Sequence, residues 1–137
     1  MEPGVKLTAI FPVSAKNLYD SWLNSSAHST FSSGKADINP RNGSPFSLQN
    51  GYLKGTNLIL QPFGRIVQSL RTSDFPDGAP DSRLELLFEK HNSSTKLTLI
   101  HTQLPSGDEK KYEKFWKENY IKSMRDYFKQ KKPVKKS

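Results

Sequence analysis

Residues 112–128, YEKFWKENYIKSMRDYF, combine large apolar side chains with charged ones at helical spacing. At 100° per residue, the aromatic and apolar side chains fall in one broad sector, and the charged ones lie mainly opposite. The sector contains Tyr112, Phe115, Trp116, Tyr120, Met124 and Tyr127. A stripe this wide exceeds the narrow seam of a coiled coil. It predicts a long C-terminal helix that lies across a curved sheet.

The preceding residues predict that sheet. Residues 5–11, VKLTAIF, alternate as a strand does. Ser14 is a natural N-cap for a following helix, and the serine-rich residues 25–33 predict a second short helix. From residue 34 to 103, short alternating runs are separated by turn signals about every ten residues, which is typical of an antiparallel sheet. The predicted order is strand, two short helices, about six strands and a long helix capped by Ser106 or Asp108.

Composition supports one folded domain. The chain has 137 residues, of which 34% are hydrophobic and 25% charged, a globular profile. The net charge of +8 depends on residues 129–137, KQKKPVKKS, because the rest of the chain carries 16 basic and 13 acidic residues. We therefore predict one domain over residues 1–130 and a basic disordered tail over 131–137. Since the lysines of the predicted helix face solvent and its aromatics face the core, we expect no nucleic-acid binding.

Several classes of protein are not expected. The sequence has no membrane-length apolar run and no signal-peptide pattern, so we expect a cytoplasmic protein that binds no membrane. It has no cysteine, and His28, His91 and His101 lack the spacing of a metal site. It also lacks nucleophile and nucleotide-binding motifs. We expect no enzymatic activity, no catalytic residue, no metal and no cofactor.

A set of short motifs extends over almost the whole chain. They lie within VKLTAIFPVSAKNLYDSWLN, GSPFSLQNGYLKGTNLILQPFGRIVQSLRTSDFPDG, TKLTLIHTQLP and FWKENYIKSMRDYF. In this order they resemble the helix-grip fold of the START-like or SRPBCC superfamily. The branch they resemble is the C-terminal domain of the activator of heat-shock-protein-ninety ATPase. The matching positions are Gly51 and Gly55, Ile66-Val67 and Arg71, Pro76 to Gly78, Thr95 to Leu99, and Trp116 to Tyr120.

This resemblance implies an α+β fold. A curved antiparallel sheet of about six or seven strands wraps around a long C-terminal helix, with two short helices after the first strand. Two positions depart from the family pattern: Leu70 stands where Trp is usual, and Phe115 stands where Gly is usual. In the full-length co-chaperone, a separate N-terminal domain carries much of the stimulating activity. The resemblance therefore implies chaperone binding more strongly than ATPase activation.

Two functions remain open. The first is an interaction module that docks on heat-shock protein ninety or another protein. The alternative is a carrier or sensor of a small lipophilic ligand, held between the C-terminal helix and the sheet. Strand alternation and the helix sector predict that such a cavity is lined by Leu70, Leu86, Phe88, Leu97, Leu99, Trp116 and Tyr120. His101 would lie near one end, either as a hydrogen-bonded rim residue or as a pocket group suited to acid–base work.

Overall fold

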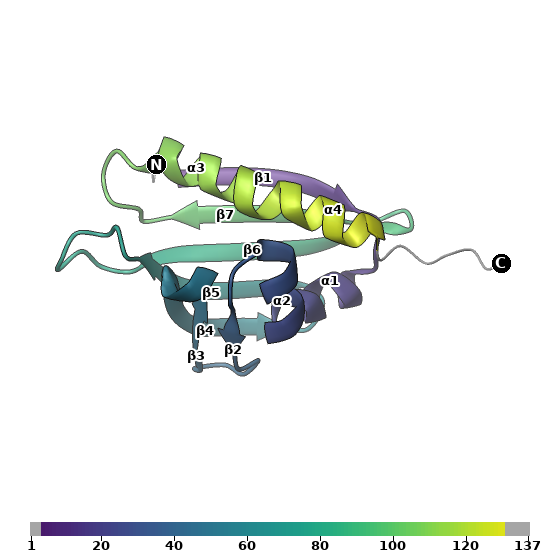
Figure 1. Ribbon diagram of the computed structural model, residues 1–137. Coiled ribbons are helices and arrows are strands. Elements are labelled where there is room, and N and C mark those ends of the chain that lie inside the picture. The colour runs from purple at the N-terminus through teal and green to yellow at the C-terminus, as the bar shows by residue number, and fades with distance from the viewer. Residues whose placement is uncertain (1–3, 131–137) are drawn as a thin grey trace.

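The computed structural model describes residues 4–130, so the predicted tail at 131–137 lies outside the described residues (Figure 1). Its sheet has seven strands in the order β1-β7-β6-β5-β4-β3-β2. Every neighbouring pair is antiparallel. The strands are β1 (Gly4–Phe11), β2 (Asp37–Ile38), β3 (Pro45–Leu48), β4 (Leu53–Gln61), β5 (Arg65–Thr72), β6 (Ser82–His91) and β7 (Ser94–Thr102). The α+β fold class is therefore confirmed.

Two short helices follow β1, as predicted. They are α1 (Ala15–Trp22) and α2 (Ser25–Ser32). The Ser14 hydroxyl caps α1 by accepting the Asn17 N–H at 3.0 Å, which confirms the predicted N-cap. The Asn24 side chain caps α2 by accepting the Ala27 N–H at 2.8 Å. A short 3₁₀ turn, η1 (Gln49–Gly51), connects β3 to β4 at Asn50-Gly51.

The C-terminal helical segment consists of α3 (Glu109–Trp116), a π-helical turn η2 (Lys117–Ile121) and α4 (Lys122–Gln130). It runs along β1 and contacts that strand through both α3 and α4 (Figure 1). Asp108 is the N-cap residue, but its side chain makes no capping hydrogen bond. No helix in the described part of the chain is both long and apolar enough to cross a membrane.

The π-turn explains which helical residues face the sheet. The buried side chains recur every fourth residue, at Tyr112, Trp116, Tyr120, Met124 and Phe128. A four-residue spacing drifts about 40° per step around an α-helix of 3.6 residues per turn, so four steps would drift about 160°. The extra residue of a π-turn takes up about 100° of this drift. As a result, one face stays on the sheet for the whole segment.

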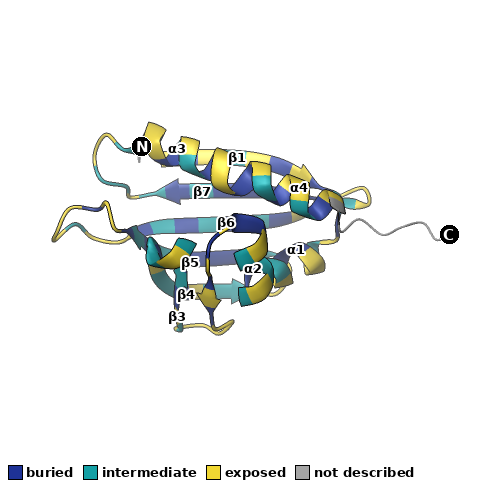
Figure 2. Cartoon of the chain, viewed as in Figure 1, coloured by how far each residue is buried: buried dark blue, intermediate teal, exposed yellow. Residues whose placement is uncertain are grey.

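The structure differs from the predicted helix sector at four positions. Phe115 and Tyr127 were expected inside the apolar stripe but are only half-buried, whereas Ile121 and Phe128 are buried. The prediction assumed regular α-helical phase. The π-turn shifts the phase of the residues after Trp116 and so accounts for Ile121, Tyr127 and Phe128, whereas Phe115 precedes the turn and lies at the edge of the buried stripe. Figure 2 shows the buried residues as a stripe along the helical segment facing the sheet.

A close backbone approach accounts for Gly55. A Cβ at this position would collide with the carbonyl oxygen of Ser69 on the neighbouring strand. Gly51 instead has a positive φ of 93°, which glycine adopts readily. The two glycines of the hairpin motif therefore serve different purposes: one allows a turn, and the other allows two strands to approach.

Candidate functional site

The predicted cavity residues of β6 and β7 lie on one face of the sheet. Cross-strand register places Leu86 opposite Leu99 and Phe88 opposite Leu97, while His101 lies opposite Leu84. Trp116 and Tyr120 on the C-terminal helical segment and Leu70 on β5 belong to the same hydrophobic cluster. All eight predicted residues are buried: Leu70, Leu86, Phe88, Leu97, Leu99, His101, Trp116 and Tyr120. Their role in ligand binding stays a prediction.

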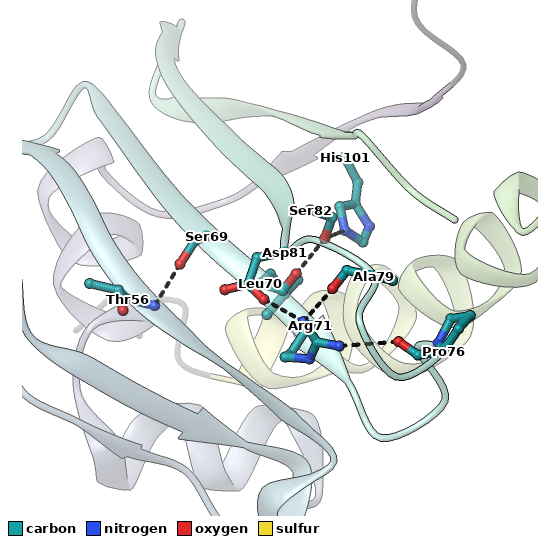
Figure 3. A network of polar contacts seen from close by, with 9 residues as sticks. All are labelled: Thr56, Ser69, Leu70, Arg71, Pro76, Ala79, Asp81, Ser82 and His101. Carbon is teal, nitrogen blue, oxygen red and sulfur yellow. Dashed lines mark hydrogen bonds and ion pairs between the residues drawn. The ribbon is translucent and has the colours of Figure 1, made fainter. Parts of the chain in front are cut away.

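His101 is the polar residue of this cluster, and all of it is buried. The Trp116 indole Nε1–H donates to His101 Nδ1 at 3.0 Å, which fixes the proton of the neutral ring on Nε2. His101 Nε2 then donates to the Ser82 hydroxyl at 2.7 Å, and that hydroxyl donates to the Leu70 carbonyl oxygen at 2.6 Å (Figure 3). Burial lowers the His101 pKa to about 4, so the ring is neutral near pH 7.

These contacts bear on both alternatives for His101. The ring is hydrogen-bonded, as the first alternative expected, but it is enclosed between Ser82 and Trp116 and does not lie at a rim. A serine within hydrogen-bond reach of a histidine can act as a nucleophile, with the histidine as its general base. Here the histidine donates to the serine, and the serine proton points at a backbone carbonyl. This direction does not activate the Ser82 hydroxyl.

His28 forms a second buried polar contact, which sequence reasoning missed. Its Nδ1–H donates to the Trp22 carbonyl oxygen at 2.8 Å, so the Tyr120 hydroxyl donates to its Nε2 at 2.8 Å. Burial lowers the His28 pKa to about 4 and raises the pKa of Tyr120. His28 and Phe31 share one buried face of α2 at a spacing of three residues. That spacing was the available signal.

Three aromatic side chains, one per turn of the C-terminal helical segment, each carry a bonded polar tip. We call Tyr112, Trp116 and Tyr120 the aromatic ladder. The Tyr112 hydroxyl bonds the Thr72 hydroxyl of β5 at 2.7 Å. Trp116 bonds His101 of β7, and Tyr120 bonds His28 of α2. The ladder therefore fixes the helix to two strands and to a second helix through directional contacts as well as apolar packing.

Arg71 and the Pro76–Gly78 loop, two separate motifs in the sequence, form one structural unit. The Arg71 guanidinium donates to the Ala79 carbonyl at 2.8 Å and to the Asp81 carboxylate at 2.7 Å (Figure 3). It also reaches the Pro76 carbonyl at 3.5 Å and lies 5.4 Å from the Phe75 ring centre. Arg71 thus shapes the β5–β6 loop.

The surface also carries hollows. None of five hollows on residues 4–130 is lined by any of the eight predicted cavity residues. The first encloses about 540 Å³ between α1, the β2–β3 connection and the β4–β5 turn. Within residues 4–130, no group of three or more His, Asp or Glu side chains is placed to hold a metal ion.

Comparison with known proteins places the chain in a family. Residues 12–129 match the profile described as "Activator of Hsp90 ATPase homolog 1-like protein". The chain belongs to this family. A relative from Dictyostelium discoideum, "Activator of 90 kDa heat shock protein ATPase homolog", is 26% identical over 90% of this chain and 32% of its own length. An uncharacterised protein of Schizosaccharomyces pombe is 27% identical over 86% of this chain and 35% of its own length.

The chain thus spans about a third of the length of these two curated relatives. A solved structure, an HSP90 activator from Plasmodium falciparum, superposes with a TM-score of 0.84 at 19% identity. The superposition covers 90% of this chain and 94% of that one. At this level of identity, the likeness establishes the shared helix-grip fold of the Hsp90-activator family.

Proposed function

We propose that this chain is a non-enzymatic, cytoplasmic protein-binding module that contacts the Hsp90 chaperone. The observation that carries the proposal is the aromatic ladder. Its three side chains occupy the space between helix and sheet, and each polar tip is bonded within the chain. An interior occupied in this way favours contacts made by the outer surface. Membership of the Hsp90-activator family supplies the class of partner.

The lipophilic-carrier alternative has weaker support. A ligand between helix and sheet would have to displace side chains that are already buried together. A polar group of that ligand could reach His101 only by replacing Trp116 or Ser82, because each ring nitrogen has a partner. Leaving a buried donor unpaired costs about 1–3 kcal/mol. Protein binding therefore stands ahead of ligand carriage.

Calorimetric titration of the purified chain with purified Hsp90 tests the proposal, with bovine albumin as the control protein. We expect saturable binding to Hsp90 and no binding to albumin. The ATPase rate of Hsp90, measured beside it, should change little, since the resemblance assigns much of the stimulation to a separate domain. Absence of Hsp90 binding at protein concentrations of 100 µM or more would overturn the proposal.

A thermal-shift screen with fatty acids, sterols and flavonoids tests the carrier alternative in parallel. A ligand at a hundredfold excess over its dissociation constant stabilises the folded state by about 2.7 kcal/mol. We expect no such shift. A dose-dependent rise in melting temperature, together with no Hsp90 binding, would favour the carrier.

A further inference from the structure

The hollow beside the β4–β5 turn has walls from three separate segments. Residues 19–24 belong to α1 and its C-terminal end, residues 40–42 to the β2–β3 connection, and residues 60–63 to the end of β4 and the turn. Tyr19, Leu23, Leu60 and Phe63 give it apolar walls. The hollow is open to solvent and has a volume of about 540 Å³, which leaves room for one large apolar side chain.

Backbone hydrogen bonds hold these walls in place. The Leu60 N–H donates to the Asn42 side chain at 2.9 Å. Gly43 N–H donates to the Asn57 carbonyl at 2.6 Å, and Asn57 N–H donates to the Ser44 carbonyl at 2.9 Å. The register of β4 shifts just beyond this point, between residues 57 and 59. The β2–β3 connection is thereby tied to β4, and the hollow is largely pre-formed.

Phe63 stands at the rim on an unusual backbone. The turn is closed by the Gly64 N–H donating to the Gln61 carbonyl at 3.0 Å, and Phe63 has a φ of 63°. Glycine or asparagine is favoured there, and other L-residues pay about 1–2 kcal/mol in the left-handed region. Phe63 contacts Tyr19 edge-on at 5.6 Å but remains 42% exposed. Residues with strained backbone cluster at functional sites, so this turn is a candidate for binding.

The two charged side chains that line the hollow, Asp20 and Arg41, differ in whether they have an ion-pair partner among the described residues. Asp20 forms an exposed ion pair with Lys16 at 2.8 Å. The exposed Arg41 side chain makes no hydrogen bond or ion pair with any other residue between 4 and 130. An available cation therefore stands beside an apolar hollow.

We infer that this hollow binds an extended protein segment in which a large apolar side chain is flanked by a carboxylate. The apolar side chain packs against Tyr19, Leu23 and Leu60, Phe63 covers it, and the carboxylate pairs with Arg41. The inference rests on the proposed function in taking a protein as the occupant, and it names the surface through which this chain makes that contact. The aromatic ladder is buried and does not form part of this contact surface.

Two capped peptides probe the hollow independently of Hsp90: acetyl-Asp-Leu-Phe-Asp-amide and acetyl-Lys-Leu-Phe-Lys-amide. Backbone amide shifts of the ¹⁵N-labelled chain report the site. We expect saturable shifts confined to residues 19–24, 40–42 and 60–64, with the acidic peptide binding at least fivefold more tightly. Arg41→Gln should reduce that preference by roughly two- to fivefold, the range of an exposed ion pair. Lys122→Gln, which removes an equal charge on α4, should not.

Phe63→Asn separates binding from folding. Asparagine tolerates positive φ, so the variant keeps its melting temperature within a few degrees and loses at least tenfold in affinity for the acidic peptide. Ile10→Thr removes another exposed apolar side chain, on β1, and leaves the affinity unchanged. Shifts spread over the surface, or equal affinity in wild type and Phe63→Asn, would overturn the assignment.

The same variants titrated with Hsp90 keep the two proposals apart. Peptide binding in the hollow without Hsp90 binding would refute the proposed function and leave the hollow assigned. Hsp90 binding that is equal in wild type and Phe63→Asn, with no peptide shifts, would refute the hollow alone. Loss of Hsp90 binding in both Phe63→Asn and Arg41→Gln, with Ile10→Thr unaffected, supports both.

Discussion

Trp116 and Phe63 are both large aromatic side chains, but they differ in burial, backbone conformation and hydrogen bonding. Trp116 is fully buried, has regular helical geometry, and donates its ring N–H to His101. Phe63 is 42% exposed and adopts a left-handed backbone at a turn. The first belongs to a region where each ladder residue has a bonded tip. The second belongs to a region that leaves both apolar surface and a cation uncovered.

The difference separates stability from recognition. In the interior, packing and hydrogen bonds reinforce one another, so the helix has one position on the sheet. At the hollow, the backbone is held and Tyr19 and Leu23 are buried, but Phe63 and Arg41 remain exposed. We therefore expect substitutions in the interior to change unfolding free energy strongly, and substitutions at the hollow to change binding while leaving stability nearly constant.

The largest effect is expected for Trp116→Ala. Truncating a buried aromatic side chain costs about 3–5 kcal/mol, and this change also leaves His101 Nδ1 without its donor. Urea unfolding measures the loss. Phe115→Ala, at the half-buried neighbouring position, is the matched control and should cost less than half as much. Equal losses of unfolding free energy at the two positions would contradict the view that the aromatic ladder contributes more to stability than its half-buried neighbours.

The second largest effect is expected from acidification, which should lower the free energy of unfolding. The pKa of both buried histidines is lowered to about 4 in the folded chain, whereas an unfolded histidine has a pKa near 6.5. Below that value the unfolded state binds more protons, so stability falls as pH drops from 6.5 towards 4. Between pH 7 and 5 we expect a loss of roughly 2 kcal/mol per histidine.

Single-histidine variants measure this pH dependence. Replacing His28 or His101 with Gln should remove about half of the slope of unfolding free energy between pH 7 and 5. His91→Gln, at an exposed position, is the control and should leave the slope unchanged. If all three variants retain the full slope, the two buried rings are not its source.

A smaller effect is expected from the Tyr120 hydroxyl. Tyr120→Phe leaves His28 Nε2 buried without a donor, which costs about 1–3 kcal/mol. In a double-mutant cycle with His28→Leu, the two changes should couple by about 1 kcal/mol. Tyr52→Phe removes a hydroxyl bonded to the exposed Asp74, where water can replace it, and should cost less. Additive effects for the His28–Tyr120 pair would contradict the hydrogen bond.

The smallest effect is expected at Phe63. Phe63→Asn loses the Tyr19 ring contact, about 0.5–1.5 kcal/mol, but relieves a comparable backbone cost. The unfolding free energy should change by less than about 1 kcal/mol in the same urea experiment. A loss above 2 kcal/mol would make Phe63 a core residue and erase the contrast with Trp116.

Local patterns in the sequence were enough to predict most of the fold. Alternation along β6 and β7 placed Leu86, Phe88, Leu97 and Leu99 on one face, because side-chain direction in a strand follows a strict period of two. The Ser14 cap was predictable for a similar reason, since it depends on neighbouring residues alone. These features need no information from distant parts of the chain.

The polar contacts of the interior could not be predicted in this way. His28 and Tyr120 are 92 residues apart in sequence, and their hydrogen bond depends on how α2 packs against the C-terminal helical segment. The π-turn was missed because regular α-helical phase was assumed. The hollow was missed as well, because Phe63 and Arg41 come to line it together only when β4 is tied to the β2–β3 connection.

The position of β1 in the sheet has a consequence for how the chain folds. This strand contains the first described residues, yet its neighbour is β7, with Phe11 opposite Thr95 and Gly4 opposite Thr102. During synthesis, β1 cannot pair with β7 until residues 94–102 have left the ribosome. Such long-range pairing slows folding, because a large loop must close before the contacts form. Joining the sequence of β1 behind the C-terminal helical segment by a flexible linker would change that order of events while keeping every strand pairing of the sheet.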